Sequence, residues 1–458
     1  MEKKCRLLTF LLAAVMVLGI CIAPMRVSAA GTVHVTKEDI PDEALWKAII
    51  CAAGGNMDNL SEYDEKGYDL DTSVKTLCLE LDYRTHLESL KGLELFPDLE
   101  VLEILINSGH DARKNIYQHT VENETILNSL ANLKSLWINL CVNGTSWKVK
   151  NPKLEKLRID GGTLKSLDVS ACTKLKDIFF RGVKFTKLNL AKNKELAYIY
   201  LYAPELNNLT LPDSTTLESL HINSKCLTKL KLSKYKKLER LFVDYCTKLK
   251  ELDVSGCAKL DWLDALDCTE LKKLDVSGCT KLKNLYVSGS TKLKELDVSD
   301  CTKLESFAVD DCTKLKNLDV SNCKHLTYLN CKGTKLSKLN LKSCKKLEYI
   351  SIDAYTTKSL ALPSNLKQKT EKNYLEIRLR VKKNQTIKLK NYIPSGFQFA
   401  GYGKQRTDSD KKPKLAKKNP FPKVVSYNKA KNEVKVLNNK GSYLSSFCFK
   451  KGKLEVWI

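Results

Sequence analysis

Leu271-Lys-Lys-Leu274-Asp-Val276-Ser-Gly-Cys279-Thr-Lys-Leu282-Lys-Asn-Leu285-Tyr-Val287 contains one short phrase twice, two leucines three apart followed by a valine. Around it a leucine returns every 21 or 22 residues, at positions 133, 154, 175, 196, 217, 238, 260, 282, 304, 326 and 347. One such unit cannot bury its own apolar face and must stack on copies of itself. The period therefore predicts a solenoid.

The start of the chain is typical of an export signal. Lys3, Lys4 and Arg6 precede an apolar run, and Val27-Ser28-Ala29 provides the small residues of a cleavage site. We expect residues 1–29 to be removed and the protein to be secreted. No other run approaches 18 apolar residues, so any retention at the cell surface is expected to be peripheral.

The pattern changes along the mature chain and predicts three parts. Residues 30–76 contain a helix signal at Glu43–Ala53, after Pro41 and before Gly54-Gly55, and are expected to cap the open end of the core. The repeats span 77–366, with an insertion at 106–126. Residues 367–458 contain short alternating apolar runs separated by turn residues, which predicts an all-β module similar to an immunoglobulin-like sandwich.

Positive charge gathers in the last part. Residues 366–458 carry 24 Lys and Arg against 6 Asp and Glu, whereas the whole chain has a net charge of +24. The segment Lys404–Lys423 holds seven of these lysines and three prolines. Such asymmetry predicts contact with an anionic envelope polymer. Because export is expected, no nucleic-acid partner is expected.

Fifteen cysteines follow the expected cleavage site, and most obey the repeat: Cys246, Cys257, Cys268, Cys279, Cys301, Cys312 and Cys323 lie 11 or 22 apart. Ser290 and Thr334 take the same place where the series is interrupted. A ladder of packed thiols explains small residues at this place, and disulfides between coils are the alternative. Without a CxxC pair or a Cys/His cluster, no metal site is expected, and no cofactor is expected either.

The two halves of each repeat differ in their outward positions. In one half these positions are Lys, Glu and Asp, as at Lys250, Glu251 and Asp253, which indicates a solvated face. In the other half they are rich in aromatics. Because alternate residues of a strand point to opposite faces, the leucines are expected inside and the aromatics outside.

Parallel strands would place Trp137, Arg158, Phe179, Tyr200, His221 and Phe242 in one row. Exposed rings in a row favour a partner surface, although rings can also simply pack between strands. The candidate partner-binding residues are Trp137, Arg158, Phe179, Tyr198, Tyr200, Tyr202, His221, Arg240, Phe242, Trp262, Tyr286, Tyr328 and Tyr349. Glu218, Asp244, Asp264 and Asp310 are expected as polar groups around them.

The segment Leu326-Thr-Tyr-Leu329-Asn-Cys331-Lys-Gly-Thr334-Lys-Leu336-Ser-Lys-Leu339-Asn-Leu341 resembles the bacterial leucine-rich repeat. With the recurring LDVSxC phrase, the array over 77–366 is similar to the internalin J-type subfamily of secreted and surface proteins of Gram-positive bacteria. The resemblance implies a solenoid with one short parallel strand per coil, an irregular convex side and a concave partner site. Two departures stand out. Cys, Ser or Thr replaces the usual turn Asn, and Ala53, Gly55 and Met57 fall where calcium ligands would be needed, so no calcium site is expected.

These features predict a non-catalytic, monomeric binding protein. A protein partner, in adhesion or host interaction, is the first hypothesis for the concave face, and a glycan stacked on the same rings is the second. An enzyme is not expected, because no phrase such as GxSxG or HExxH occurs.

Overall fold

The computed structural model describes residues 32–82, 87–107, 126–139, 146–161, 164–353, 356–357 and 359–363, together with short strands between 374 and 457. The expected signal peptide, most of the expected insertion, and Lys404–Lys423 except for its strand β28 (Leu415–Ala416) lie outside these residues. In the described part of the chain, no helix is long and apolar enough to cross a membrane.

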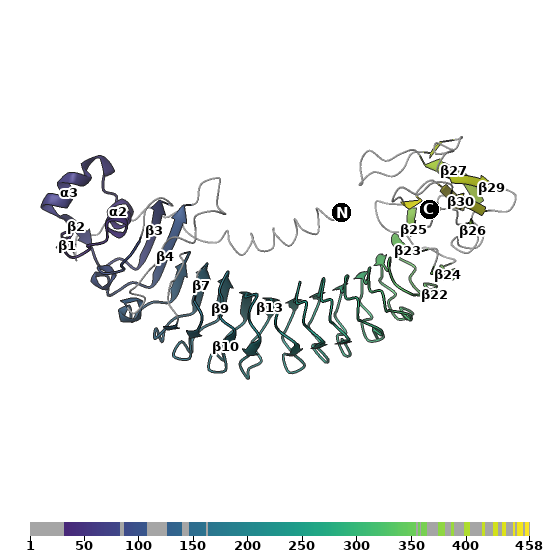
Figure 1. Cartoon of the computed structure of the whole chain (residues 1–458), viewed down its shortest axis with the longest axis horizontal. Helices are drawn as coiled ribbons and strands as arrows, with labels where there is room; N and C mark the ends of the chain where they lie inside the picture. The colour runs from purple at the N-terminus through teal and green to yellow at the C-terminus, as the bar shows by residue number, and fades with distance from the viewer. Residues whose placement is uncertain are drawn as a thin grey trace.

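A long parallel sheet lines the inner side of a curved solenoid (Figure 1). Each strand pairs with the next along the chain, so the rest of each coil makes the return connection. The strands are β3 (Thr76–Asp82), β4 (Val101–Asn107), β5 (Ser135–Ile138), β7 (Lys156–Asp160), β9 (Asp177–Arg181), β11 (Tyr198–Tyr202), β13 (Ser219–Asn223), β15 (Arg240–Phe242), β17 (Trp262–Asp264), β19 (Asn284–Tyr286), β20 (Ser306–Ala308), β21 (Tyr328–Asn330), β23 (Tyr349–Asp353) and β25 (Tyr374–Arg380).

Shorter strands follow the outer side of the arc and pair only in groups of two or three (Figure 1). The continuous pairing inside and the interrupted pairing outside fit the curvature, because coils lie closer together on the inner side. The outer strands are β6 (Trp147–Lys148), β8 (Leu167–Asp168), β10 (Lys187–Asn189), β12 (Asn208–Thr210), β14 (Lys229–Lys231), β16 (Glu251–Asp253), β18 (Lys273–Asp275), β22 (Lys338–Asn340) and β24 (Ser359–Ala361).

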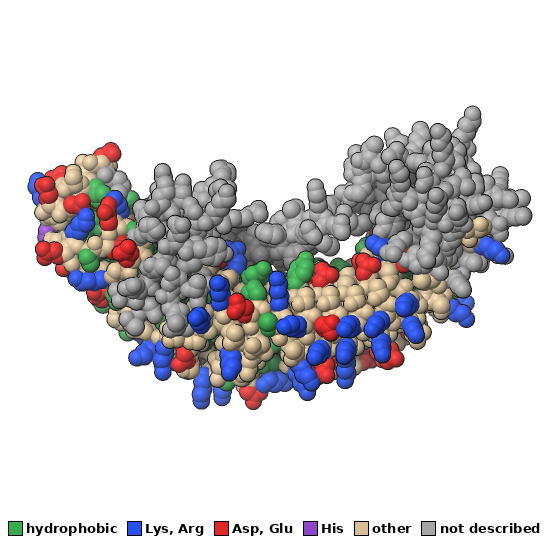
Figure 2. Space-filling model, viewed as in Figure 1, with side chains coloured by type: hydrophobic (Ala, Val, Ile, Leu, Met, Phe, Trp, Pro, Cys, Tyr) green, Lys and Arg blue, Asp and Glu red, His purple; other side chains and the backbone are tan. Residues whose placement is uncertain are grey.

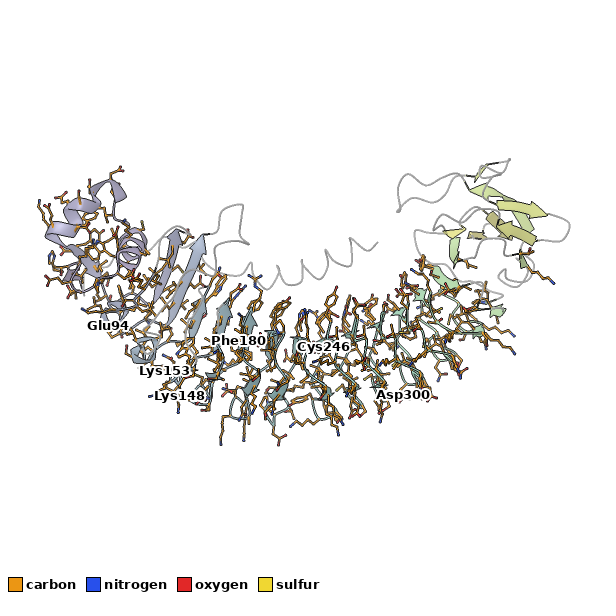
Figure 3. The ribbon with its side chains drawn as sticks, viewed as in Figure 1. Glu94, Lys148, Lys153, Phe180, Cys246 and Asp300 are labelled. Carbon is orange, nitrogen blue, oxygen red and sulfur yellow. The ribbon has the colours of Figure 1, made fainter. Side chains whose placement is uncertain are left out.

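The repeated leucines form one continuous core between the two sets of strands. Leu282, Leu285 and Val287 are fully buried, as the alternation along the strand requires. Figure 3 labels two interior residues, Phe180 and Cys246, which are also fully buried. This architecture is a parallel solenoid of leucine-rich coils.

A small helical segment precedes the first coil. Helix α2 (Glu43–Ala52) packs on β3, and it is accompanied by β1 (Thr32–Val35), η1 (Met57–Asn59), α3 (Leu60–Lys66) and β2 (Tyr68–Asp71). The buried carboxylate of Asp42 accepts hydrogen bonds from Leu45 N at 2.9 Å, Glu88 N at 2.6 Å and Ser89 N at 3.0 Å. It thereby caps α2 and ties the helix to the first coil. Two further 3₁₀ turns, η2 (Leu93–Leu95) and η5 (Ile126–Ser129), lie within the coils.

The cysteines of the ladder carry free thiols and are buried. Their Sγ atoms reach main-chain oxygens of neighbouring coils: Cys257 contacts Leu232 O at 3.3 Å, and Cys279 contacts Val254 O at 3.3 Å. Asn193 also donates its amide to an earlier coil, to Val169 O at 2.9 Å and Cys172 O at 2.8 Å. A turn residue whose short side chain carries a hydrogen-bond donor therefore links successive coils.

Left-handed residues recur on the turns that follow the inner strands from β15 to β21. Tyr245, Asp267 and Asp311 have φ values of 57°, 54° and 56°, and Gly289 and Gly333 continue the series at 76° and 78°. A Cβ on either glycine would lie 2.2 Å from the carboxylate of the Asp one coil earlier. Asp and Gly therefore alternate along this turn for a steric reason.

The last strands include most of the runs expected from sequence. They are β26 (Thr386–Lys388), β27 (Gln398–Gly403), β28, β29 (Val425–Asn428), β30 (Glu433–Val436), β31 (Tyr443–Leu444), β32 (Phe447–Lys451) and β33 (Leu454–Trp457). Strand β25 pairs in parallel with β23, so the inner sheet continues beyond residue 366. Strands β27, β32 and β33 pair antiparallel, as do β26, β30 and β29. The immunoglobulin-like arrangement and the boundary at 366/367 stay predictions.

Candidate functional site: the concave face

The register of the inner sheet brings six of the expected residues into one row. Successive pairings set Trp137 beside Arg158, Phe179 beside Tyr200, and His221 beside Phe242, with Arg158 beside Phe179 and Tyr200 beside His221. This row follows the spacing in the sequence. It lies on the concave face, where Figure 2 shows hydrophobic side chains along the inner edge of the arc.

The side chains of this row touch one another. The Arg158 guanidinium lies 4.1 Å from the ring centroids of both Trp137 and Phe179. Phe179 and Tyr200 stack at 4.3 Å with an interplanar angle of 7°, and His221 follows at 4.4 Å from Tyr200. Phe242 lies 5.4 Å from His221. These distances are within the range of favourable ring contacts, so the row is one continuous stack.

Of the other expected residues, Tyr286 continues the first row through Asp264, which lies beside Phe242, and the rest lie in neighbouring rows. Trp262 connects rows, because its ring lies 6.3 Å from Phe242 and 5.5 Å from Tyr286. The register places Tyr198, Arg240, Trp262, Tyr328 and Tyr349 two residues before the first row, whereas Tyr202 lies beside Arg181 and Asn223 in a third row. The thirteen residues thus occupy three rows of one face.

The aromatic surface has two parts. The continuous stack runs from Trp137 to Tyr286, and a second stack joins Tyr328 and Tyr349 at 4.7 Å and 5°. Strand β20 lies between them, where Ser306 and Ala308 occupy the places of rings. The sequence pattern does not show this gap, because it counts aromatics without assigning them to rows.

Arg158 is the most unusual charged group of the face. Among the described residues no carboxylate lies within ion-pair distance of it, and its buried Nε has no hydrogen-bond partner. Burial lowers the pKa of Arg158. The neighbouring Arg181, by contrast, makes two hydrogen bonds to Asp160, at 2.5 Å and 2.6 Å. Arg158 is therefore a cation that retains donor capacity on this face.

Two carboxylates near Arg158 were not among the expected residues. Burial raises the pKa of Asp177 and that of Glu103, whose Oε2 lies 3.7 Å from Cys78 Sγ. Both occupy rows of the aromatic residues, beside Lys156 and Trp137. An alignment of the repeats that follows the strand register would identify both carboxylates.

Three carboxylates expected as exposed rim groups are placed differently. Asp244 and Asp264 are 8% and 7% exposed and share a hydrogen bond, so burial and mutual repulsion raise the pKa of Asp264 well above its usual range. Burial also raises the pKa of Asp310, which accepts a hydrogen bond from Ser288 Oγ. Glu218 fits the expectation better, since it accepts from Tyr198 Oη at 2.7 Å. Asp264 is the last residue of β17 and Asp244 lies just after β15, and both side chains are buried against each other.

His221 is held in its neutral form. Its ring lies between those of Tyr200 and Phe242, and burial lowers its pKa to about 4. A neutral imidazole behaves here as another flat ring of the stack. Within the described residues, no group of three His, Cys, Asp or Glu side chains could hold a metal ion.

Residues 258–389 match the family model described as At1g61320/AtMIF1, LRR domain. This part of the chain is therefore a leucine-rich repeat domain. No curated protein matches the chain.

Among solved structures, the chain is similar to the functional domain of InlJ from Listeria monocytogenes, which includes a cysteine ladder, with 16% identity, a TM-score of 0.38 and coverage of 94% of this chain and 99% of that one. It is also similar to the LRR protein LIC12759 of Leptospira interrogans, at 17% identity, TM-score 0.34 and coverage of 62% and 88%. YopM from Yersinia enterocolitica WA-314 follows at 19% identity, TM-score 0.32 and coverage of 73% and 72%.

Proposed function

We propose that this is an exported bacterial binding protein without catalytic activity, which recognises a protein partner with its concave face in adhesion or host interaction. The observation that carries the proposal is the continuous stack from Trp137 to Tyr286 on the concave face. Solenoid curvature provides such faces for binding, and aromatic residues and Arg dominate the energetics of protein interfaces.

The geometry of the rings favours a protein over a glycan. Sugars stack on open ring faces, but here the faces of Phe179 and Tyr200 cover each other, as do those of Tyr328 and Tyr349. Arg158 covers one face each of Trp137 and Phe179. The stack therefore presents ring edges to solvent, and edges pack well against apolar and aromatic side chains.

Arg158 adds an anchor of defined chemistry. Its planar faces are occupied by rings, so a ligand can reach only the edge of the guanidinium, whose donors match a carboxylate in a bidentate arrangement. We expect a carboxylate of the partner protein to bind there. The proposal also includes that the protein is secreted, that it is retained peripherally through Lys404–Lys423, and that it is a monomer.

Site-specific crosslinking tests the concave site. A photo-reactive phenylalanine replaces Tyr202, which is 40% exposed on this face, or Lys187, which is exposed on outer strand β10. With extracts of host and bacterial surfaces, we expect a discrete protein adduct from position 202 and none from position 187. Addition of Phe179→Ala and Tyr200→Ala should reduce the adduct at least tenfold.

Two outcomes would contradict the proposal. Equal adducts from both positions would indicate nonspecific capture. Adducts that disappear after enzymatic deglycosylation of the extract, together with binding of the freed glycans that Tyr200→Ala abolishes, would establish the carbohydrate hypothesis instead.

A further inference from the structure

Lysines dominate one coil near the end of the described solenoid. Between Asp319 and Glu348 the chain contains seven lysines and no acidic residue. The side chains of Lys324, Lys345 and Lys346 are exposed at the turn that leads into the inner strands. Figure 2 shows rows of Lys and Arg along the outer side of the arc. This coil is a concentrated source of positive charge outside the basic tail.

Some lysines of earlier coils are neutralised by carboxylates. Lys134 bonds to Glu100 at 2.6 Å, Lys174 to Glu195 at 2.7 Å, and Lys176 to Glu155 at 2.9 Å, in each case across coils. Among the described residues, no carboxylate lies within ion-pair distance of Lys324, Lys345 or Lys346. Their positive charge is therefore available to a ligand.

Like charges lie side by side in two adjacent coils. Lys324 and Lys345 are 21 residues apart, the same offset that pairs Tyr328 with Tyr349. Lys346 Nζ donates a hydrogen bond to the ring Nδ1 of His325, at 3.1 Å. Cations placed opposite one another in adjacent strands or coils destabilise a fold, so their retention is better explained by a bound anion than by stability.

A lysine occupies the same position of the repeat in several successive coils. Lys237, Lys259, Lys281 and Lys303 occupy the place that His325 and Lys346 occupy later. Beside these lysines runs a shallow groove of about 570 Å³, which Glu239, Asp261 and Glu305 also line. In the next coil Thr327 takes the place of Glu305, and Glu348 restores a carboxylate at this place one coil later.

We propose that Lys303, Lys324, Lys342, Lys345 and Lys346, named the basic coil surface, bind a flexible linear polyanion that carries phosphate groups. Lysine binds phosphate as a compact point charge and needs no planar partner. Coils repeat about every 4.8 Å along this edge, a spacing that suits a chain of closely placed anionic groups. The site is independent of the concave face.

The geometry separates this ligand from nucleic acids. The edge is curved, whereas duplex DNA is stiff over about 50 nm, so a flexible chain can follow the lysines further. Single strands are held by base stacking on exposed rings. The exposed large apolar residues of the described part, Val33, Tyr198, Tyr202 and Tyr245, all lie outside this coil.

Lysine footprinting on the full chain tests the proposal, with long-chain inorganic polyphosphate as the probe. Mass spectrometry reports acetylation at each lysine, so the basic tail does not obscure the result. At low salt we expect polyphosphate to reduce labelling of Lys324, Lys345 and Lys346 at least threefold, and to leave Lys134, Lys174 and Lys176 unchanged. Higher salt should reverse the protection, because binding releases counterions.

A matched pair of triple variants completes the experiment. Lys324→Gln, Lys345→Gln and Lys346→Gln together should abolish protection of Lys303 and Lys342, whereas Lys134→Gln, Lys174→Gln and Lys176→Gln should preserve it. Protection confined to the tail would overturn the proposal. Equal protection of these lysines by duplex DNA or by polyglutamate would overturn the assignment to a flexible phosphate polymer.

Discussion

At the scale of single residues, the buried carboxyl pair of Asp244 and Asp264 is the feature with the clearest consequence. Neither carboxyl is more than 8% exposed, and each repels the charge of the other. Because the pKa of Asp264 is raised in the fold, the folded protein holds a proton that the unfolded chain releases at lower pH. The protonated carboxyl of Asp264 therefore contributes to stability at acidic pH, and this contribution is lost as the pH rises.

We predict that Asp264→Asn stabilises the protein at pH 7 by about 1–2 kcal/mol, because a neutral amide replaces a carboxyl that is costly to ionise. Urea unfolding at pH 4 to 8 measures the effect, which should shrink toward pH 4. Asp275 provides the control of opposite sign: its hydrogen bonds with Ser277 lower its pKa, so Asp275→Asn should weaken the protein at pH 7 and lose its effect on acidification. A pH-independent effect of Asp264→Asn would refute the explanation.

Sequence alone predicts which residues share the concave row, because the period fixes the register. Trp137, Phe179 and Tyr200 lie where their spacing places them. It does not predict that the Arg158 guanidinium covers the faces of two rings, or that Asp264 is buried, because both depend on side-chain direction. The period of a repeat determines positions along the sheet, whereas packing determines exposure.

At the scale of elements, the turns after the inner strands determine how closely coils can stack. Gly289 has a positive φ and lies against Asp267, whereas Gly182 has a similar φ of 72° and its Cβ would find its nearest neighbour at 3.4 Å. The two glycines thus separate two costs that usually occur together, the cost of left-handed backbone and the cost of steric overlap.

We predict that Gly289→Ala destabilises the protein by at least about 1 kcal/mol more than Gly182→Ala. Left-handed backbone costs an alanine roughly 1–2 kcal/mol at either position, and only position 289 adds a clash with a carboxylate. Thermal and urea unfolding of the two variants supply the comparison. In a background that already carries Asp267→Ala, the extra destabilisation caused by Gly289→Ala should disappear. If it persists in this double variant, the backbone and not Asp267 is responsible.

The elements illustrate what the sequence can predict. Helix α2 begins at the expected residue and ends one residue before the expected end, because Pro41 and Gly54-Gly55 mark its limits. The pairing of β25 with β23 was not expected, since strand signals do not name a partner strand. The role of Asn193 was not expected, because cysteine, serine and threonine alone define the pattern at this place of the repeat.

At the scale of the whole molecule, each coil contacts only its neighbours, so damage at one end should stay local. Asp42 offers the test, because its carboxylate satisfies three main-chain donors where α2 meets the first coil.

We predict that Asp42→Ala reduces the local stability of α2 and β3 by about 2–3 kcal/mol, the cost of a lost cap and of buried donors without an acceptor. Hydrogen exchange should show faster exchange in α2 and β3, with the amides of 257–344 unchanged. Uniform loss of protection along the solenoid would show instead that the array unfolds as one cooperative unit.

The alternation of Asp267, Gly289, Asp311 and Gly333 along one turn has a consequence for how this array can be shortened or lengthened. Excision of residues 289–310 would bring Asp311 directly after Asp267, so the Asp267 carboxylate would have to leave the place it holds against Gly289. Excision of 289–332 would bring Gly333 there and leave that carboxylate in place. From Asp267 onward, the module that can be exchanged without moving this side chain, in engineering or by duplication of the coding sequence, is a pair of coils.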